Sequence, residues 1–180
     1  MLRLFVAVCF PKEVREELSR LQTGVVGVNW VPAENLHLTL RFIGEVSESD
    51  VEEISSALAQ VRSEPFKINF GELGWFGSRN KIRTLWIGIN HCSELEGLKR
   101  AVDQKLFLSG MGRAGKSFVP HVTLGRVREK PRGVQELFSW GLSISHKPVT
   151  VDQVVLVSSV LRKNGPIYRP LLVHSFVGSG

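Results

Sequence analysis

His37-Leu38-Thr39-Leu40 and His121-Val122-Thr123-Leu124 are two copies of one four-residue pattern, placed far apart in the chain. Alternate residues of a β-strand point to the same face of a sheet. We therefore expect each histidine to share a face with the threonine two positions later, while the aliphatic residues between them enter a core. The pattern predicts two strands that each present an imidazole and a hydroxyl side by side.

The composition is that of a globular protein, with 180 residues of which 43% are hydrophobic and 22% are charged. The net charge of +6 favours a polyanionic partner, above all a nucleic acid. No apolar run approaches the roughly 20 residues that span a bilayer. The apolar start of the chain lacks the small-residue cleavage site of a signal peptide. We therefore expect a cytoplasmic protein that does not bind membranes.

Apolar spacing predicts alternating strands and helices, and their order over residues 2–89 resembles their order over residues 82–177. We expect residues 1–180 to form a single domain of two duplicated lobes, related by a pseudo-twofold that brings the motif strands face to face across a cleft. The expected strands span residues 2–10, 36–43, 66–76, 82–89, 118–127, 141–149, 151–161 and 167–177, and the expected helices begin near residues 11, 47, 93 and 133.

Two histidines in matching settings indicate a functional site, because burying two imidazoles for packing alone carries a desolvation cost. A metal site is not expected, since neither motif contains a carboxylate and no third histidine has suitable spacing. Cys9 and Cys92 are too few and too far apart for a disulfide framework or a metal knuckle. No serine or cysteine occupies a nucleophile elbow.

Metal-free acid–base chemistry remains. Histidine titrates near neutrality, so one imidazole can accept a proton while the other donates one. Threonine hydroxyls can donate hydrogen bonds to an anionic oxygen held between the rings. This arrangement suits in-line attack on a phosphodiester, with His37 and His121 as catalytic residues. The near-symmetry of the two halves leaves open which histidine is the acid.

Two arginines follow the motifs and are predicted to bind substrate. Strict alternation places Arg41 on the face of His37 and puts Phe42 in the core. The same rule places Arg126 on the face opposite His121. Either a bulge at Gly125 turns Arg126 back, or Arg126 acts from the end of the strand, or it is structural.

The chain resembles the two-histidine phosphoesterases, and specifically the RNA 2′,3′-cyclic phosphodiesterases, also called 2′-5′ RNA ligases. The resemblance spans nearly the whole chain and rests on both motifs with their flanking residues, on the start of the chain and on a tail segment. The segments are Arg3-Leu4-Phe5-Val6-Ala7, residues 30–44 (WVPAENLHLTLRFIG), residues 118–127 (FVPHVTLGRV) and residues 156–161 (LVSSVL).

The resemblance implies an α+β, bilobal fold in which two antiparallel sheets flank a central cleft, with helices outside. It implies hydrolysis of a terminal 2′,3′-cyclic phosphate to a 2′-phosphate without metal or nucleotide cofactor, and possible reverse 2′-5′ ligation. In that scheme His37 donates a proton to the leaving 3′ oxygen, His121 activates water, and Thr39 and Thr123 hold the phosphate.

The expected partner is RNA with a 2′,3′-cyclic phosphate end, and the expected state is a monomer. Two alternatives stay open. One is an RNA- or nucleotide-binding module that performs no chemistry. The other is a phosphodiesterase that acts on a small cyclic nucleotide or a 2′-5′ oligonucleotide.

Overall fold

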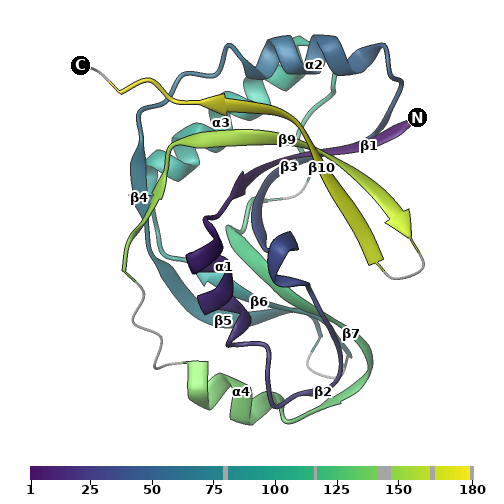
Figure 1. Ribbon diagram of the computed structural model, residues 1–180, viewed down its shortest axis with the longest axis vertical. Coiled ribbons are helices and arrows are strands. Elements are labelled where there is room, and N and C mark those ends of the chain that lie inside the picture. Colours follow the sequence, from purple (N-terminus) through teal and green to yellow (C-terminus); the bar gives the residue numbers. More distant parts are fainter. Residues whose placement is uncertain (79–80, 116, 142–146, 163–164, 179–180) are drawn as a thin grey trace.

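The computed structural model describes residues 1–78, 81–115, 117–141, 147–162 and 165–178. These residues form four α-helices, a short 3-10 helix and strands that mostly belong to one antiparallel sheet (Figure 1). The predicted mixture of helices and antiparallel strands is therefore confirmed. The strands are β1 (Leu2–Cys9), β2 (Val26–Trp30), β3 (His37–Val46), β4 (Phe66–Ile68), β5 (Phe70–Ser78), β6 (Lys81–Ile89), β7 (His121–Arg132), β8 (Val149–Val151), β9 (Gln153–Arg162) and β10 (Gly165–Ser175). The helices are α1 (Lys12–Ser19), η1 (Ala33–Asn35), α2 (Asp50–Leu58), α3 (Ser93–Leu108) and α4 (Val134–Gly141).

The eight-stranded sheet has the order β10-β9-β1-β3-β7-β6-β5, and β2 pairs with the free side of β7. The two motif strands, β3 and β7, are neighbours at its middle and are joined through one residue pair, Leu38 with Val122. Each of these residues lies between the histidine and the threonine of its motif. The hydrogen bonds of this pair join strands that the family resemblance places in two separate sheets. The structure therefore has one large sheet with a narrow junction, and the junction sets the two motifs side by side.

The main core lies between one face of this sheet and the helices. Leu98, Val102 and Leu106 repeat at helical spacing along α3 and pack with Val6 and Leu38 of the sheet. A smaller cluster forms where Leu137 of α4 packs near Leu85 of β6 and Val25. Figure 1 shows α2 and α3 together at one end of the molecule and α4 at the opposite end.

Two predicted elements differ from the structure. The strand expected over residues 66–76 is interrupted at Asn69, so that β4 pairs with β8 in a separate two-stranded sheet while β5 joins the large sheet. Of the strand expected over residues 141–149, residues 142–146 lie outside the described residues and β8 begins at Val149. In the described part of the chain, no helix has the length and apolar character needed to cross a membrane.

Candidate active site

Both motif histidines are held through the same ring nitrogen. His37 Nδ1 donates to Asn35 O at 2.6 Å, and His121 Nδ1 donates to Val119 O at 2.6 Å. The acceptor in each case is the carbonyl two residues before the histidine. A carbonyl oxygen can only accept, so Nδ1 carries the proton of the neutral ring and Nε2 is left unprotonated. Nε2 is therefore the atom of each imidazole that can take up or release a proton.

The two Nε2 atoms differ in their surroundings. His37 Nε2 lies 3.0 Å from Thr39 Oγ1, so the threonine hydroxyl donates to the neutral ring. This contact confirms that the first histidine and its threonine share a face. Among the described residues, His121 Nε2 has no hydrogen-bond partner, and Thr123 lies across from Trp86 of β6. The second imidazole is therefore the one whose Nε2 is open to an incoming group.

Aromatic rings fix the orientation of both imidazoles. Phe5 of β1 stacks on His37 with ring centroids 4.9 Å apart and planes inclined by 30°. Phe76 of β5 meets His121 edge-on at 4.8 Å, and Trp86 lies 5.8 Å from the same ring. Each imidazole therefore packs against aromatic side chains from its own half of the sheet.

Both motif strands contain a bulge immediately after the threonine. In β3, Thr39 pairs with Ala7 but Arg41 pairs with the adjacent Val6, so Leu40 is an extra residue. In β7, Thr123 pairs with Trp86 but Gly125 pairs with Leu85, so Leu124 is extra. A bulge of one residue reverses the alternation of every side chain that follows it. The positions five residues after each histidine, Phe42 and Arg126, therefore lie on the histidine face.

The bulge in β3 turns Arg41 away from the site, so its predicted position beside His37 is wrong. Its side chain is 6% exposed. Arg41 Nη1 donates to Asp103 Oδ1 at 3.3 Å, and Nη2 donates to Met111 O at 3.3 Å and Gly112 O at 3.0 Å. Lys99 of α3 also contacts Asp103. Arg41 therefore ties the first motif strand to α3 and to the loop that leads toward the second motif.

Replacing Arg41 with methionine is expected to lower the free energy of unfolding by about 2 kcal/mol, because a buried guanidinium loses its ion pair and two hydrogen bonds to carbonyls, while Asp103 keeps Lys99 as a partner. Urea unfolding measures the loss. The matched control is Arg100→Met on α3, whose side chain is 74% exposed and whose ion pair with Glu96 is 4.0 Å long. This control is expected to change stability by less than about 0.5 kcal/mol. Full stability of the Arg41 variant, together with weaker substrate binding, would instead place Arg41 at the substrate.

Phe42 and Arg126 take the positions on the histidine face. Phe42 is 70% exposed, so the prediction that it lies in the core is wrong. Its ring centroid is 6.1 Å from that of Phe5, which stacks on His37. Of the three alternatives for Arg126, the structure confirms the bulge, which falls at Leu124 and Gly125. A Cβ on Gly125 would approach Trp30 Cε3 to 2.7 Å, so β2 packs too closely there for a side chain.

Arg126 and the two imidazoles form one electrostatic cluster. Burial lowers the pKa of His37, the hydrogen bond to Asn35 opposes this, and the positive charges of His121 and Arg126 lower the pKa further. Burial also lowers the pKa of His121, again opposed by its carbonyl partner and assisted by Arg126. A bound phosphate would act in the opposite direction, because a negative charge between the rings favours the imidazolium form. The cluster is therefore suited to hold an anion.

Several residues of the site were not identified from the sequence. Phe5 and Phe76 reach the imidazoles from strands that are distant in the chain, and only the strand order brings them near. The role of Asn35 could have been inferred from its position, because it precedes its histidine by two residues, as Val119 does in the second motif. That cue concerns the backbone carbonyl, whose role does not depend on residue type.

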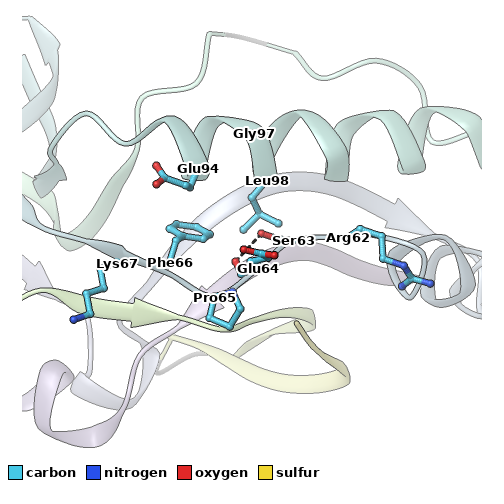
Figure 2. Close-up of a pocket in the computed structure, with 9 residues that line it drawn as sticks. All are labelled: Arg62, Ser63, Glu64, Pro65, Phe66, Lys67, Glu94, Gly97 and Leu98. Carbon is cyan, nitrogen blue, oxygen red and sulfur yellow. Dashed lines mark hydrogen bonds between the residues drawn. The ribbon is translucent and has the colours of Figure 1, made fainter. Parts of the chain in front are cut away.

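No metal centre emerges from the donor groups of the described residues, among which no cluster of three or more His, Cys, Asp or Glu could hold an ion. A shallow depression of about 500 Å³ lies elsewhere, between residues 62–67 and α3 (Figure 2). Phe66, Leu98 and Glu94 line it, and it includes no residue of either motif. The histidine cluster is therefore the candidate active site.

Comparisons with known proteins identify the family of the chain. A model of the LigT-like phosphoesterase family matches the chain twice, over residues 8–86 and 87–168. An Archaeoglobus fulgidus protein named RNA 2′,3′-cyclic phosphodiesterase is 38% identical over 175 residues, which cover 96% of this chain and 99% of that protein. A Thermotoga maritima protein of the same name is 34% identical over 185 residues, covering 98% and 97%.

Solved structures share the fold. A protein of Thermus thermophilus superposes with a TM-score of 0.78 at 30% identity, covering 99% of this chain and 100% of its own. Escherichia coli LigT, solved in complex with 3′-AMP, superposes with a TM-score of 0.77 at 25% identity, covering 97% and 98%. The resemblance seen in the sequence is thereby confirmed, and the chain belongs to the LigT-like phosphoesterase family.

Proposed function

We propose that this protein hydrolyses the 2′,3′-cyclic phosphate at the end of an RNA to a 2′-phosphate, by paired histidine acid–base catalysis without a metal ion. The observation that carries the proposal is the matched pair of imidazoles, each with its Nδ1 held by a carbonyl and its Nε2 available for proton transfer. Full-length relatives named RNA 2′,3′-cyclic phosphodiesterase support the choice of substrate. The reverse 2′-5′ ligation belongs to the same proposal.

His121 acts as the base in the proposed reaction and His37 as the acid. His121 Nε2 accepts a proton from water as the water oxygen bonds to phosphorus. The bond from phosphorus to the 3′ oxygen breaks, and the imidazolium of His37 gives its Nε2 proton to that oxygen. The open Nε2 of His121 supports this assignment. The phosphate charge keeps His37 protonated against the burial that lowers its pKa in the free protein.

Arg126, Thr39 and Thr123 hold the phosphate in this proposal. Arg126 is the cation whose charge reaches both imidazoles, and guanidinium groups suit the oxygens of a phosphate. Arg41 is not assigned to substrate, because its guanidinium is engaged with Asp103 and two carbonyls. Exposed aromatic rings stack on splayed RNA bases, and Phe42 offers such a ring on the histidine face.

The duplicated, two-lobed organisation of a single domain over residues 1–180 is also proposed. Two features support it. The family model matches each half of the chain separately. The two motif strands contain the same bulge at the same place, after Thr39 and after Thr123. A cytoplasmic location and a monomeric state stay predictions that accompany the proposed activity.

The test is a product analysis on a defined RNA oligomer that ends in a 2′,3′-cyclic phosphate, with and without EDTA. We expect a 2′-phosphate as the product and the same rate under both conditions. Loss of turnover in EDTA, restored by added metal, would rule out the metal-free mechanism. A parallel assay on a cyclic mononucleotide separates RNA from a small cyclic nucleotide as the substrate. Product-like nucleotide binding without turnover on either substrate would identify a binding module.

A further inference from the structure

Tyr168, the only tyrosine of the chain, reaches the first motif from the last strand. It lies on β10 and pairs with Ser159 of β9, at the edge of the sheet. Its ring meets Phe5 edge-on with centroids 5.1 Å apart at 73°, and meets His37 edge-on at 5.3 Å and 89°. Phe5 and Tyr168 therefore enclose one side of the His37 imidazole.

The β9–β10 hairpin is tied to the same imidazole by a second route. Asn35 Nδ2 donates to Pro166 O of β10 at 3.3 Å, and Asn35 O accepts the proton of His37 Nδ1. A single residue thus connects the start of β10 to the backbone bond that orients the histidine. The position of Tyr168 relative to His37 is fixed at both the ring and the main chain.

The hydroxyl of Tyr168 lacks a hydrogen-bond partner in the described part of the chain. Among the described residues, none forms a hydrogen bond with it, although a partly buried tyrosine usually finds one. Burial raises the pKa of Tyr168 and the charge of Arg126 opposes the rise, so the phenol stays protonated at neutral pH and belongs to the same cluster as the imidazoles. No tyrosine hydroxyl lies beside His121 in the same way, because the rings that contact this imidazole are Phe76 and Trp86.

We propose that the Tyr168 hydroxyl donates a hydrogen bond to a phosphate oxygen of the substrate, on the His37 side of the site. Arg126 and Tyr168 then hold the phosphate from two strands on different sides of the junction between β3 and β7. The Tyr168 hydroxyl therefore lies on the side of the leaving 3′ oxygen in the proposed reaction. This inference rests on the proposed function for its substrate and extends it with a further binding residue.

The variant Tyr168→Phe separates the hydroxyl from the ring. It keeps the ring contacts with Phe5 and His37, so stability and the pH profile are expected to stay as in the wild type. Losing a hydrogen bond to a charged oxygen is expected to lower kcat/KM on the cyclic-phosphate oligomer roughly ten- to hundredfold. Wild-type kcat/KM in this variant, measured where the wild type is active, would overturn the proposal and leave the ring as a packing group.

Binding can be tested without turnover, because a single tyrosine gives a single resonance from protein labelled with carbon-13 at the tyrosine ring carbon that bears the hydroxyl. Titration with adenosine 2′-phosphate is expected to shift this resonance in the wild type, and Arg126→Gln is expected to weaken that binding. An unchanged resonance at saturating ligand would also overturn the proposal. If the wild type fails to open any cyclic phosphate but the resonance shifts, the proposed reaction fails and the phosphate contact of Tyr168 stands.

Discussion

Replacing either His37 or His121 with asparagine is expected to lower kcat for the opening of a 2′,3′-cyclic phosphate by about 10²- to 10⁴-fold, the range typical of losing a general acid or base. The asparagine amide can still donate to Asn35 O or Val119 O, as the ring Nδ1 does. It cannot take up or release a proton near neutral pH. The change therefore removes proton transfer while keeping the local hydrogen bond.

Initial rates on the cyclic-phosphate oligomer measure this effect, and thermal unfolding checks that each variant is folded. The matched control is His91→Asn, since the His91 side chain is 80% exposed and forms an ion pair with the half-exposed Glu96. The control is expected to keep full activity. If both motif variants turned over at nearly the wild-type rate, paired histidine catalysis would be wrong.

The placement of the two histidines was predictable because it depends on local sequence. From His37 to Thr39 the alternation of a strand holds, and the contact between their side chains follows from it. The helices were predictable for the same reason, since residues such as Leu98, Val102 and Leu106 show the helical spacing by themselves. Strand alternation and helical spacing can both be recognised from residues that are close together in the sequence.

The face of each arginine was not predictable, because it depends on which residues lie across the strand. Whether β3 accommodates an extra residue at Leu40 is decided by its pairing with Ala7 and Val6, more than thirty positions away. Gly125 offered a cue for a bulge in the second motif, whereas Arg41, at the equivalent position of the first, offers none. Applying one bulge to both motifs would have aligned Phe42 with Arg126 and corrected both errors together.

The two motifs differ at the position that follows the histidine by five residues. Five residues after the histidine, one motif presents an apolar ring and the other a guanidinium, both on the histidine face. The charge of Arg126 therefore acts on two imidazoles whose own strands are otherwise alike. In the proposed binding mode, the base of the nucleotide lies toward Phe42 and its phosphate toward Arg126.

Replacing Arg126 with glutamine is expected to lower kcat/KM by about a hundredfold, because a fixed charge that stabilises the phosphate in the transition state is lost. It is also expected to move the pH dependence. The wild-type profile of kcat/KM should be bell-shaped, since one imidazole must be neutral and the other charged. Because the pKa of both rings is lowered, the bell should be centred below about pH 6.5, the ordinary value of histidine.

The direction of the shift follows from the sign of the charge. The guanidinium of Arg126 disfavours the imidazolium form and so lowers both pKa values, with burial as the larger cause. Its removal raises both, and the two limbs of the bell should move together to higher pH, as values that belong to the coupled pair. The control is Arg128→Gln, an exposed cation two residues further along β7, which should move neither limb. A hundredfold loss with limbs that stay in place would mean that Arg126 contacts the phosphate but does not set the protonation of the histidines. Burial, together with the charge of His121 acting on His37, would then account for the lowered pKa values.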